Sequence, residues 1–207
     1  MIYLMYNLHM KYAIIPLAYL LGSVPWALVI GKVFYNTDIR ESGSGNLGGT
    51  NAGRVLGKKA GVIVMTLDIL KAVLAVYLGS LFSEQIGALA GIFCTIGHCY
   101  PLFAGFRGGK AVSTSAGFLV SIVVFLKLNY LILLIPVLVF FIILYLFKMV
   151  SLASITAAFT AMITSLFLPL DWVIKATIVV LAVLIVFRHH SNIKRIMNGS
   201  ESKIKWM

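Results

Sequence analysis

The sequence is poor in charged residues, and acidic side chains are the scarcest of them. Only 11% of its 207 residues are Asp, Glu, Lys or Arg, and six are acidic. Soluble globular domains carry roughly 25% charged residues. Because 61% of the chain is hydrophobic, a soluble fold of this size would lack the polar residues to cover its surface. The composition excludes an ordinary soluble domain and indicates a membrane protein.

Strand-like alternation is also missing. The long apolar runs show no period of two, which is the mark of membrane β-strands. Helices are expected, because lipid offers the backbone no partners and a helix satisfies its own hydrogen bonds. A span needs about 20 apolar residues. We predict one all-α domain over 1–207, with about seven transmembrane helices at 12–35, 60–82, 86–101, 111–126, 129–147, 150–168 and 172–188.

Cysteine is scarce as well, and no targeting signal is evident. Cys94 and Cys99 form no CxxC pair and are expected to be small buried residues. Residues 1–11 lack a basic start and a small-residue cleavage site, so we expect an N-terminal extension rather than a removable signal peptide.

The basic residues are distributed unevenly between the predicted loops. Segments 36–59 and 102–110 and the tail 190–207 hold most of the loop lysine and arginine. Cytoplasmic loops of membrane proteins carry such an excess. We therefore predict a multi-pass membrane protein with its N-terminus outside and its C-terminus in the cytoplasm. This rule accounts for part of the net charge of +11.

Three polar segments interrupt the apolar background, and the first is rich in glycine and serine. Residues 42–51 read SGSGNLGGTN and are followed by Arg54. Glycines let backbone N–H groups turn toward one point and bind an anion, and a helix N-terminus expected near Thr50 to Ala52 adds a positive end. A flexible connector is the alternative, but a connector has no need of two Asn, a Thr and an Arg.

The second segment reads GHCYP at 97–101 and FRGGK at 106–110. A histidine at the end of an apolar span, here His98, is costly without a partner. Gly108 and Gly109 let the backbone approach a ligand, and Lys110 offers a charge for phosphate. A basic turn with a capping histidine is the alternative.

The third segment reads RHHSNI at 188–193 and continues to Arg195, Gly199 and Glu201. His189 and Asn192 are three residues apart and share a helical face. Arg188 either neutralises a substrate or anchors the helix end. No carboxylate or cysteine lies at ligand spacing from the histidines, so no metal site is expected.

Two further pairs of polar residues lie inside predicted spans. Asp68 and Lys71, at i and i+3, are expected to form a buried ion pair near the site rather than to act directly in catalysis. Ser151 and Ser154 either face a polar cavity or serve helix packing, and their spacing does not choose between these roles.

Taken in order, these residues resemble the motifs of the bacterial acyl-phosphate:glycerol-3-phosphate acyltransferase family (PlsY). The family pattern SGNxGxTN with a following Arg matches residues 44–54, and GHxxP with FxGGKG matches 97–111 except that Ala111 replaces a glycine. The pattern RHxxNIxRLxxGxE matches 188–201 except for Ile196 in place of Leu, and DxxK matches 68–71.

The resemblance implies transfer of a fatty acyl group from acyl phosphate to the 1-hydroxyl of glycerol 3-phosphate, giving lysophosphatidic acid and phosphate in phospholipid synthesis. It implies no cofactor and no nucleic acid, with the lipid bilayer and an upstream acyl-phosphate-forming enzyme as partners. Its catalytic residues would be Ser44, Arg54, Lys110, His189 and Asn192. Substrate-binding roles would fall to Gly45, Asn46, Gly48, Thr50, Asn51, His98, Gly108, Gly109, Ser151, Ser154 and Arg188.

Within that set the resemblance gives Ser44, Thr50 and the nearby glycines to the acyl phosphate, and the other catalytic residues to glycerol 3-phosphate. Phosphate is a good leaving group, so positioning and charge stabilisation are expected to carry most of the rate. The attacking hydroxyl loses its proton to the departing phosphate, which we favour, or to His189. No histidine is followed by Asp five positions later and no GxSxG motif occurs, which favours an acyl-phosphate donor. A transporter of phosphorylated solutes is the competing hypothesis, but the sequence shows no inverted repeat.

Overall fold

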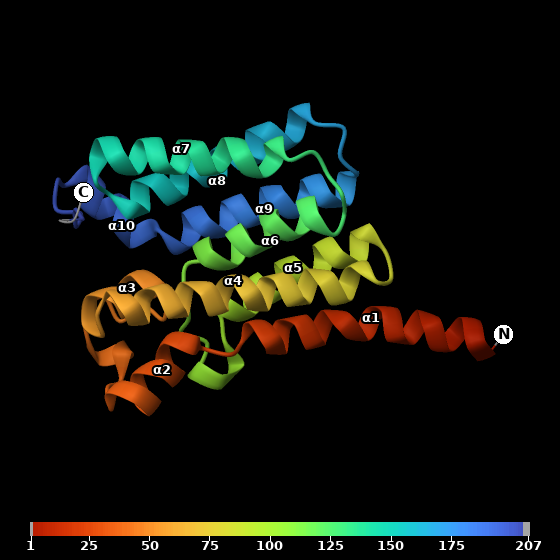
Figure 1. Cartoon of the computed structure of the whole chain (residues 1–207), viewed down its shortest axis with the longest axis horizontal. Helices are drawn as coiled ribbons and strands as arrows, with labels where there is room; N and C mark the ends of the chain where they lie inside the picture. The colour runs from red at the N-terminus through yellow and green to blue at the C-terminus, as the bar shows by residue number, and fades with distance from the viewer. Residues whose placement is uncertain (1, 205–207) are drawn as a thin grey trace. The chain divides into compact units, whose positions relative to one another are not determined.

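The computed structural model describes residues 2–204, with side chains from Lys11 onward, and this part of the chain is helical without a β-strand (Figure 1). The predicted all-α class is confirmed. The α-helices are α1 (Ile2–Gly22), α2 (Trp26–Tyr35), α3 (Gly49–Val55), α4 (Lys58–Ser80), α5 (Glu84–Cys99), α6 (Val112–Val124), α7 (Leu131–Phe147), α8 (Val150–Phe167), α9 (Trp172–Arg188) and α10 (His190–Met197). Two short 3₁₀ helices are η1 (Ile39–Glu41) and η2 (Leu102–Ala104).

The helices pack within two compact units, Met1–Leu126 and Lys127–Met207. In the first unit α4 is central and packs against α1, α2, α3, α5 and α6. In the second unit α8 packs against both α7 and α9, and α10 also contacts α8. The prediction that the whole chain acts as one domain stays a prediction.

Four helical stretches of the described chain are long and apolar enough to cross a membrane. They are Lys11–Tyr35, which joins α1 and α2, Lys58–Ser80, Glu84–Ala104, which joins α5 and η2, and Val150–Phe167. The helices α9 and α10 would add a fifth span bent by 58°. The apolar helices α6 and α7 have 13 and 17 residues. At 1.5 Å per residue they are about 20 and 26 Å long, against a hydrocarbon core of about 30 Å. The count of seven spans and their orientation stay predictions.

The segment predicted as one span at 12–35 is two helices in the structure. The helix α1 ends at Gly22 and α2 begins at Trp26, directly after Pro25. Proline has no N–H to donate and is tolerated at a helix start, where Pro25 is the N-cap residue of α2. Proline alone does not cause the break, because α1 and α7 continue through Pro16 and Pro136. The Ser23 hydroxyl at the break donates to the Tyr19 carbonyl at 2.8 Å. The break leaves backbone carbonyls that need other donors, and α4 supplies one of them.

Glycines let α1 and α5 approach each other closely. A Cβ on Gly22 would lie 1.9 Å from the carbonyl oxygen of Cys94, and one on Gly97 would lie 2.2 Å from that of Tyr19. Small residues at such contacts are the usual means of packing helices in membranes. Both Cys94 and Cys99 are buried, as the sequence predicts. The resulting tight pair fixes the end of α5, where His98 lies.

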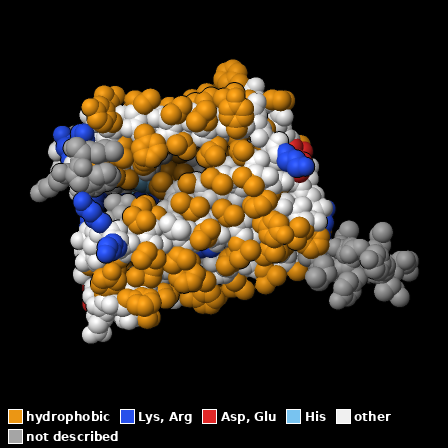
Figure 2. Space-filling view, viewed as in Figure 1, with side chains coloured by type: hydrophobic (Ala, Val, Ile, Leu, Met, Phe, Trp, Pro, Cys, Tyr) orange, Lys and Arg blue, Asp and Glu red, His pale blue; other side chains and the backbone are white. Residues whose placement is uncertain are grey.

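On the face seen in Figure 2, large apolar side chains cover much of the surface, and most of the visible Lys and Arg lie toward its two ends. Phe34, Tyr145 and Phe167 are among the exposed aromatic residues, the last with 84% of its surface accessible. Exposed apolar surface of this extent is not compatible with water and fits a lipid environment.

Candidate active site

The first polar segment folds into a loop around the side chain of Asn51. Its Oδ1 accepts the N–H of Ser44 at 2.9 Å, and its Nδ2 donates to the carbonyls of Ile39 and Ser42 at 3.3 and 3.2 Å. The residue is 2% exposed. Gly43 and Gly45 adopt φ values of +63° and +67°, which side chains rarely tolerate. Asn51, predicted to bind substrate, therefore contacts the loop backbone and sets its shape.

Three predicted ligand-binding side chains on and beside this loop are exposed. They are Ser44, Thr50 and Arg54. Thr50 and Arg54 lie on α3, which begins at Gly49 close to the predicted helix start, and a spacing of four places them on one face. Gly48 is the N-cap residue and has no side chain to cap the helix. The loop and α3 together present two hydroxyls and a guanidinium to their surroundings.

A hydrogen bond joins the first segment to the second within the first unit. Asn46 donates from Nδ2 to the carbonyl of Gly108 at 3.1 Å. Gly108 and Gly109 are buried, and Lys110 is partly exposed. The structure thus brings together the two segments that were predicted separately to bind phosphate.

The glycine pair lies directly against His98 at the end of α5. The N–H of Gly109 donates to the His98 carbonyl at 3.0 Å. A Cβ on Gly108 would lie 2.1 Å from that carbonyl oxygen, and one on Gly109 would lie 1.9 Å from Nε2 of the ring. Neither position has room for a side chain, because the segment needs close contact with α5.

Ala111 adopts a backbone conformation that favours glycine. It is buried, with φ of +67° and ψ of −5°, and precedes the first residue of α6. Such a left-handed conformation costs an L-residue roughly 1–2 kcal/mol. The departure from the family's glycine therefore stores strain immediately after Lys110.

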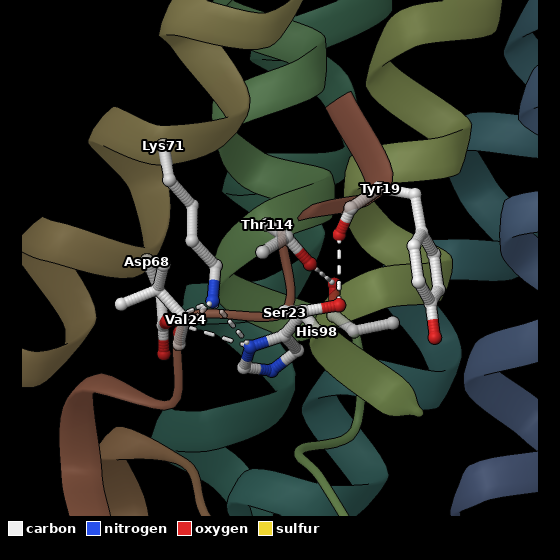
Figure 3. Close-up of polar contacts among 8 residues, drawn as sticks. Tyr19, Ser23, Val24, Asp68, Lys71, His98 and Thr114 are labelled. Atoms are coloured by element: carbon white, nitrogen blue, oxygen red, sulfur yellow. Dashed lines mark hydrogen bonds and ion pairs between the residues drawn. The ribbon is translucent and has the colours of Figure 1, made fainter. Parts of the chain in front are cut away.

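His98 belongs to a buried cluster with Asp68 and Lys71 (Figure 3). The Lys71 ammonium lies 2.8 Å from Asp68 Oδ1, 3.1 Å from His98 Nδ1 and 3.0 Å from the carbonyl oxygen of Val24. The Asp68 and Lys71 side chains are 1% and 2% exposed. The predicted ion pair is confirmed, and His98 is part of it.

In the second unit, Glu201 gathers residues of the third segment. Its Oε1 accepts the Ser151 hydroxyl at 2.8 Å and Nδ2 of Asn192 at 2.7 Å, and its Oε2 accepts Nε of Arg195 at 2.7 Å. Burial raises the pKa of Glu201, but the hydrogen bonds from Asn192, Ser151 and Arg195 outweigh it and hold that pKa below its ordinary value. Sequence reasoning gave Glu201 no role, although an acid in so basic a chain was a signal.

The remaining residues of the third segment lie at the bend between α9 and α10. His189 is buried there, and its Nδ1 donates to the Ile185 carbonyl at 2.8 Å, which makes Nε2 the acceptor of the neutral ring. Arg188 is the last residue of α9 and is partly exposed. Ser154 donates to the Val150 carbonyl one turn earlier in its own helix at 2.8 Å. Ser151, by contrast, contacts the third segment through Glu201.

The chain matches the family described as glycerol-3-phosphate acyltransferase over residues 12–199. A relative of that name from Listeria monocytogenes serovar 1/2a is 50% identical over 195 residues, which cover 92% of this chain and 95% of the relative. Another of the same name, from Geobacillus kaustophilus, is 48% identical over 196 residues, which cover 93% and 95%.

Two solved structures have a similar fold. Both are of PlsY (YgiH), described as an integral membrane glycerol 3-phosphate acyltransferase, and each alignment covers 95% of this chain and 96% of that protein. The glycerol 3-phosphate form gives a TM-score of 0.88 at 34% identity. The lysophosphatidic acid form gives 0.84 at 33% identity.

Proposed function

Because the chain belongs to the glycerol-3-phosphate acyltransferase family, a group of integral membrane enzymes of phospholipid synthesis, we propose that it acylates the 1-hydroxyl of glycerol 3-phosphate with acyl phosphate as donor. The products are lysophosphatidic acid and phosphate. The similar structure in a lysophosphatidic acid form supports this product. Family membership also favours an enzyme over the competing transporter.

The observation that carries the proposal is the hydrogen bond from Asn46 to Gly108. It joins the glycine-rich loop to the Gly-Gly-Lys segment within one unit. Both substrates carry phosphate, and the joined segments offer hydroxyls and two cations, Arg54 and Lys110, near backbone N–H groups. Phosphate is bound well by such mixtures of backbone N–H groups and cations.

The donor phosphate binds the loop through Ser44, Thr50 and the backbone around Gly45 and Gly48. Arg54 and Lys110 bind the acceptor phosphate. Asn51 supports the loop, because its side-chain amide is hydrogen-bonded to the backbone of Ser44, Ile39 and Ser42. This division predicts that Lys110→Ala raises the KM for glycerol 3-phosphate more than the KM for the donor.

In the reaction, the acceptor hydroxyl oxygen forms a bond to the acyl carbonyl carbon. The bond from that carbon to the phosphate oxygen breaks, and its electron pair leaves with phosphate. The hydroxyl proton passes to the departing phosphate. The oxyanion that forms in between is stabilised by fixed N–H donors and cations, which need no reorganisation during the step.

Residues of the second unit also take part. Asn192 is held in one orientation by Glu201, and His189 by the Ile185 carbonyl. Both help to orient the acceptor. Because His189 Nε2 is able to accept a proton, His189→Gln tests a general-base role. If the variant retains its kcat, the result supports proton transfer to the departing phosphate. If kcat falls and higher pH fails to restore it, the result supports His189 as the general base.

The enzyme acts in the bacterial cell membrane, with the polar segments toward the cytoplasm. An upstream enzyme that makes acyl phosphate supplies the donor. The excess of Lys and Arg in the segments 36–59 and 102–110 supports this orientation.

A donor comparison tests the proposed chemistry. Purified protein receives glycerol 3-phosphate with palmitoyl phosphate, palmitoyl-CoA or palmitoyl-acyl carrier protein, and lysophosphatidic acid is measured. Turnover with palmitoyl phosphate and none with the thioesters is expected. Thioester turnover at comparable kcat/KM would overturn the assignment of the donor.

A further inference from the structure

We propose that His98, fixed by the buried Asp68–Lys71 pair, is a positioning residue that sets the Gly108–Gly109–Lys110 backbone for the phosphate of glycerol 3-phosphate. The inference rests on the proposed function, because it assigns a supporting structure to the acceptor site. It differs from the resemblance, which would have His98 touch the substrate.

Two charged groups hold one edge of the imidazole. His98 Nδ1 lies 3.1 Å from the Lys71 ammonium and 3.3 Å from Asp68 Oδ1, and these two groups lie 2.8 Å apart. The Val24 carbonyl accepts a hydrogen bond from the ammonium at 3.0 Å. A paired carboxylate and ammonium are the arrangement that a membrane-buried cluster requires.

The same contacts prevent the ring from turning. Asp68 and Lys71 come from α4, His98 from the last turn of α5, and Val24 from the break between α1 and α2 (Figure 3). Three separate parts of the first unit therefore meet at one ammonium group. With Nδ1 held on one edge of the ring, the opposite edge is fixed as well.

That opposite edge supports the glycine segment. A methyl group on Gly109 would lie 1.9 Å from Nε2, so the ring and the Gly109 backbone are already in contact. The Gly109 N–H also donates to the His98 carbonyl, and the Gly108 carbonyl accepts Asn46. The segment is held from one side by α5 and from the other by the first loop, directly before Lys110.

The cluster acts through this segment and not on the substrate. Asp68, Lys71 and His98 have side chains that are 1%, 2% and 5% exposed. A shift of about 1 Å in a binding group far from the chemistry is able to cost about a hundredfold in rate. Moving the His98 ring is therefore expected to impair acceptor binding without removing any ligand-binding side chain.

The main test is His98→Asn. The Asn Oδ1 atom replaces Nδ1 as the acceptor for Lys71, while the ring edge beneath Gly109 is lost. We expect the unfolding midpoint to change little and the KM for glycerol 3-phosphate to rise about tenfold, the effect of one weakened hydrogen bond to a charged group. The KM for palmitoyl phosphate is expected to stay within about twofold.

The matched control is Thr95→Val, one turn earlier on α5. Thr95 is buried and its hydroxyl donates to the Gly91 carbonyl at 3.0 Å. This variant removes a buried polar contact without touching the glycine segment. Both KM values are expected to equal those of the wild type, which separates loss of the ring edge from general damage to α5.

A double-variant comparison tests the contact itself. Gly109→Ala places a methyl group against the His98 ring, and its effect on the acceptor KM is expected to shrink in the His98→Asn background. Gly108→Ala places a methyl group 2.1 Å from the His98 carbonyl oxygen, which no side-chain change removes. Its effect is expected to be the same in both backgrounds. If His98→Asn does not fold, a rise in acceptor KM alone with Gly109→Ala supports the proposal, and equal rises in both KM values overturn it.

Acceptor binding measured without the donor distinguishes failure of the proposed function from failure of the positioning role. Isothermal titration of glycerol 3-phosphate into the wild type and His98→Asn is expected to show weaker binding by the variant. If the wild type binds but forms no product, the proposed function fails and the positioning role stands. If the wild type forms product and the variant binds and turns over normally, the positioning role is overturned.

Discussion

Lys71→Met isolates the electrostatic role of the buried cluster and should be among the most destabilising single changes in the first unit. Asp68 is 1% exposed, its Oδ1 lies 2.8 Å from the Lys71 ammonium and 3.3 Å from His98 Nδ1, and neither carboxylate oxygen has a hydrogen-bond partner among the described residues. Removing the lysine takes the nearest counter-charge from a buried carboxylate, which costs about 3–5 kcal/mol. It also takes a donor from the Val24 carbonyl at the α1–α2 break, which adds about 1 kcal/mol.

The assay is equilibrium unfolding in mixed detergent micelles, followed by circular dichroism. A loss of about 4 kcal/mol corresponds to roughly a thousandfold change in the folding equilibrium. The double variant Asp68→Asn, Lys71→Met removes both charges and is expected to recover at least about 2 kcal/mol of that loss. Arg40→Gln, which breaks the more exposed pair with Asp38, is the control and is expected to change stability little. A double variant as unstable as Lys71→Met would contradict the claim that the stability loss comes from the unpaired Asp68 carboxylate.

Three other predictions follow from separate parts of the chain. Ala111→Gly relieves a left-handed alanine and should stabilise the protein by up to about 1 kcal/mol in the same assay; a loss of stability would contradict the strain. Because the folded state lowers the pKa of Glu201, its contribution is present above the unfolded pKa of about 4.3 and is lost as pH falls through the folded value. The wild type should therefore have a higher free energy of unfolding than Glu201→Gln at neutral pH, and this difference should shrink in acid. A difference that does not change with pH would contradict this. Lys58→Cys should react with a membrane-impermeant maleimide only in inside-out vesicles and Lys127→Cys only in intact cells, and the reverse pattern would contradict the orientation.

The sequence predicted features that depend on local pattern. Asp68 and Lys71 were placed in one pair because residues three apart on a helix are neighbours and lipid forces charges together. A helix start was expected near Thr50 to Ala52, and α3 begins at Gly49. All-helical structure followed from long apolar runs, since a spanning segment in lipid satisfies its own backbone.

Features that depend on contacts between distant residues were not predictable from pattern. The contacts of Asn51 with the loop backbone and of His98 with Lys71 are examples, because tertiary packing brings these partners together. Glu201 contacts Ser151, which lies 50 positions earlier. The break before Pro25 was missed because hydropathy continues through it, and a proline did not by itself indicate it, since α1 and α7 continue through Pro16 and Pro136.

The central claim is acyl transfer from acyl phosphate to glycerol 3-phosphate. The most direct measurement incubates the purified protein with palmitoyl phosphate, with and without glycerol 3-phosphate, and quantifies phosphate and lysophosphatidic acid together. Both products are expected to form in equal amounts, and phosphate release is expected to depend on the acceptor. Phosphate release that is the same without glycerol 3-phosphate, or no lysophosphatidic acid at all, would contradict it.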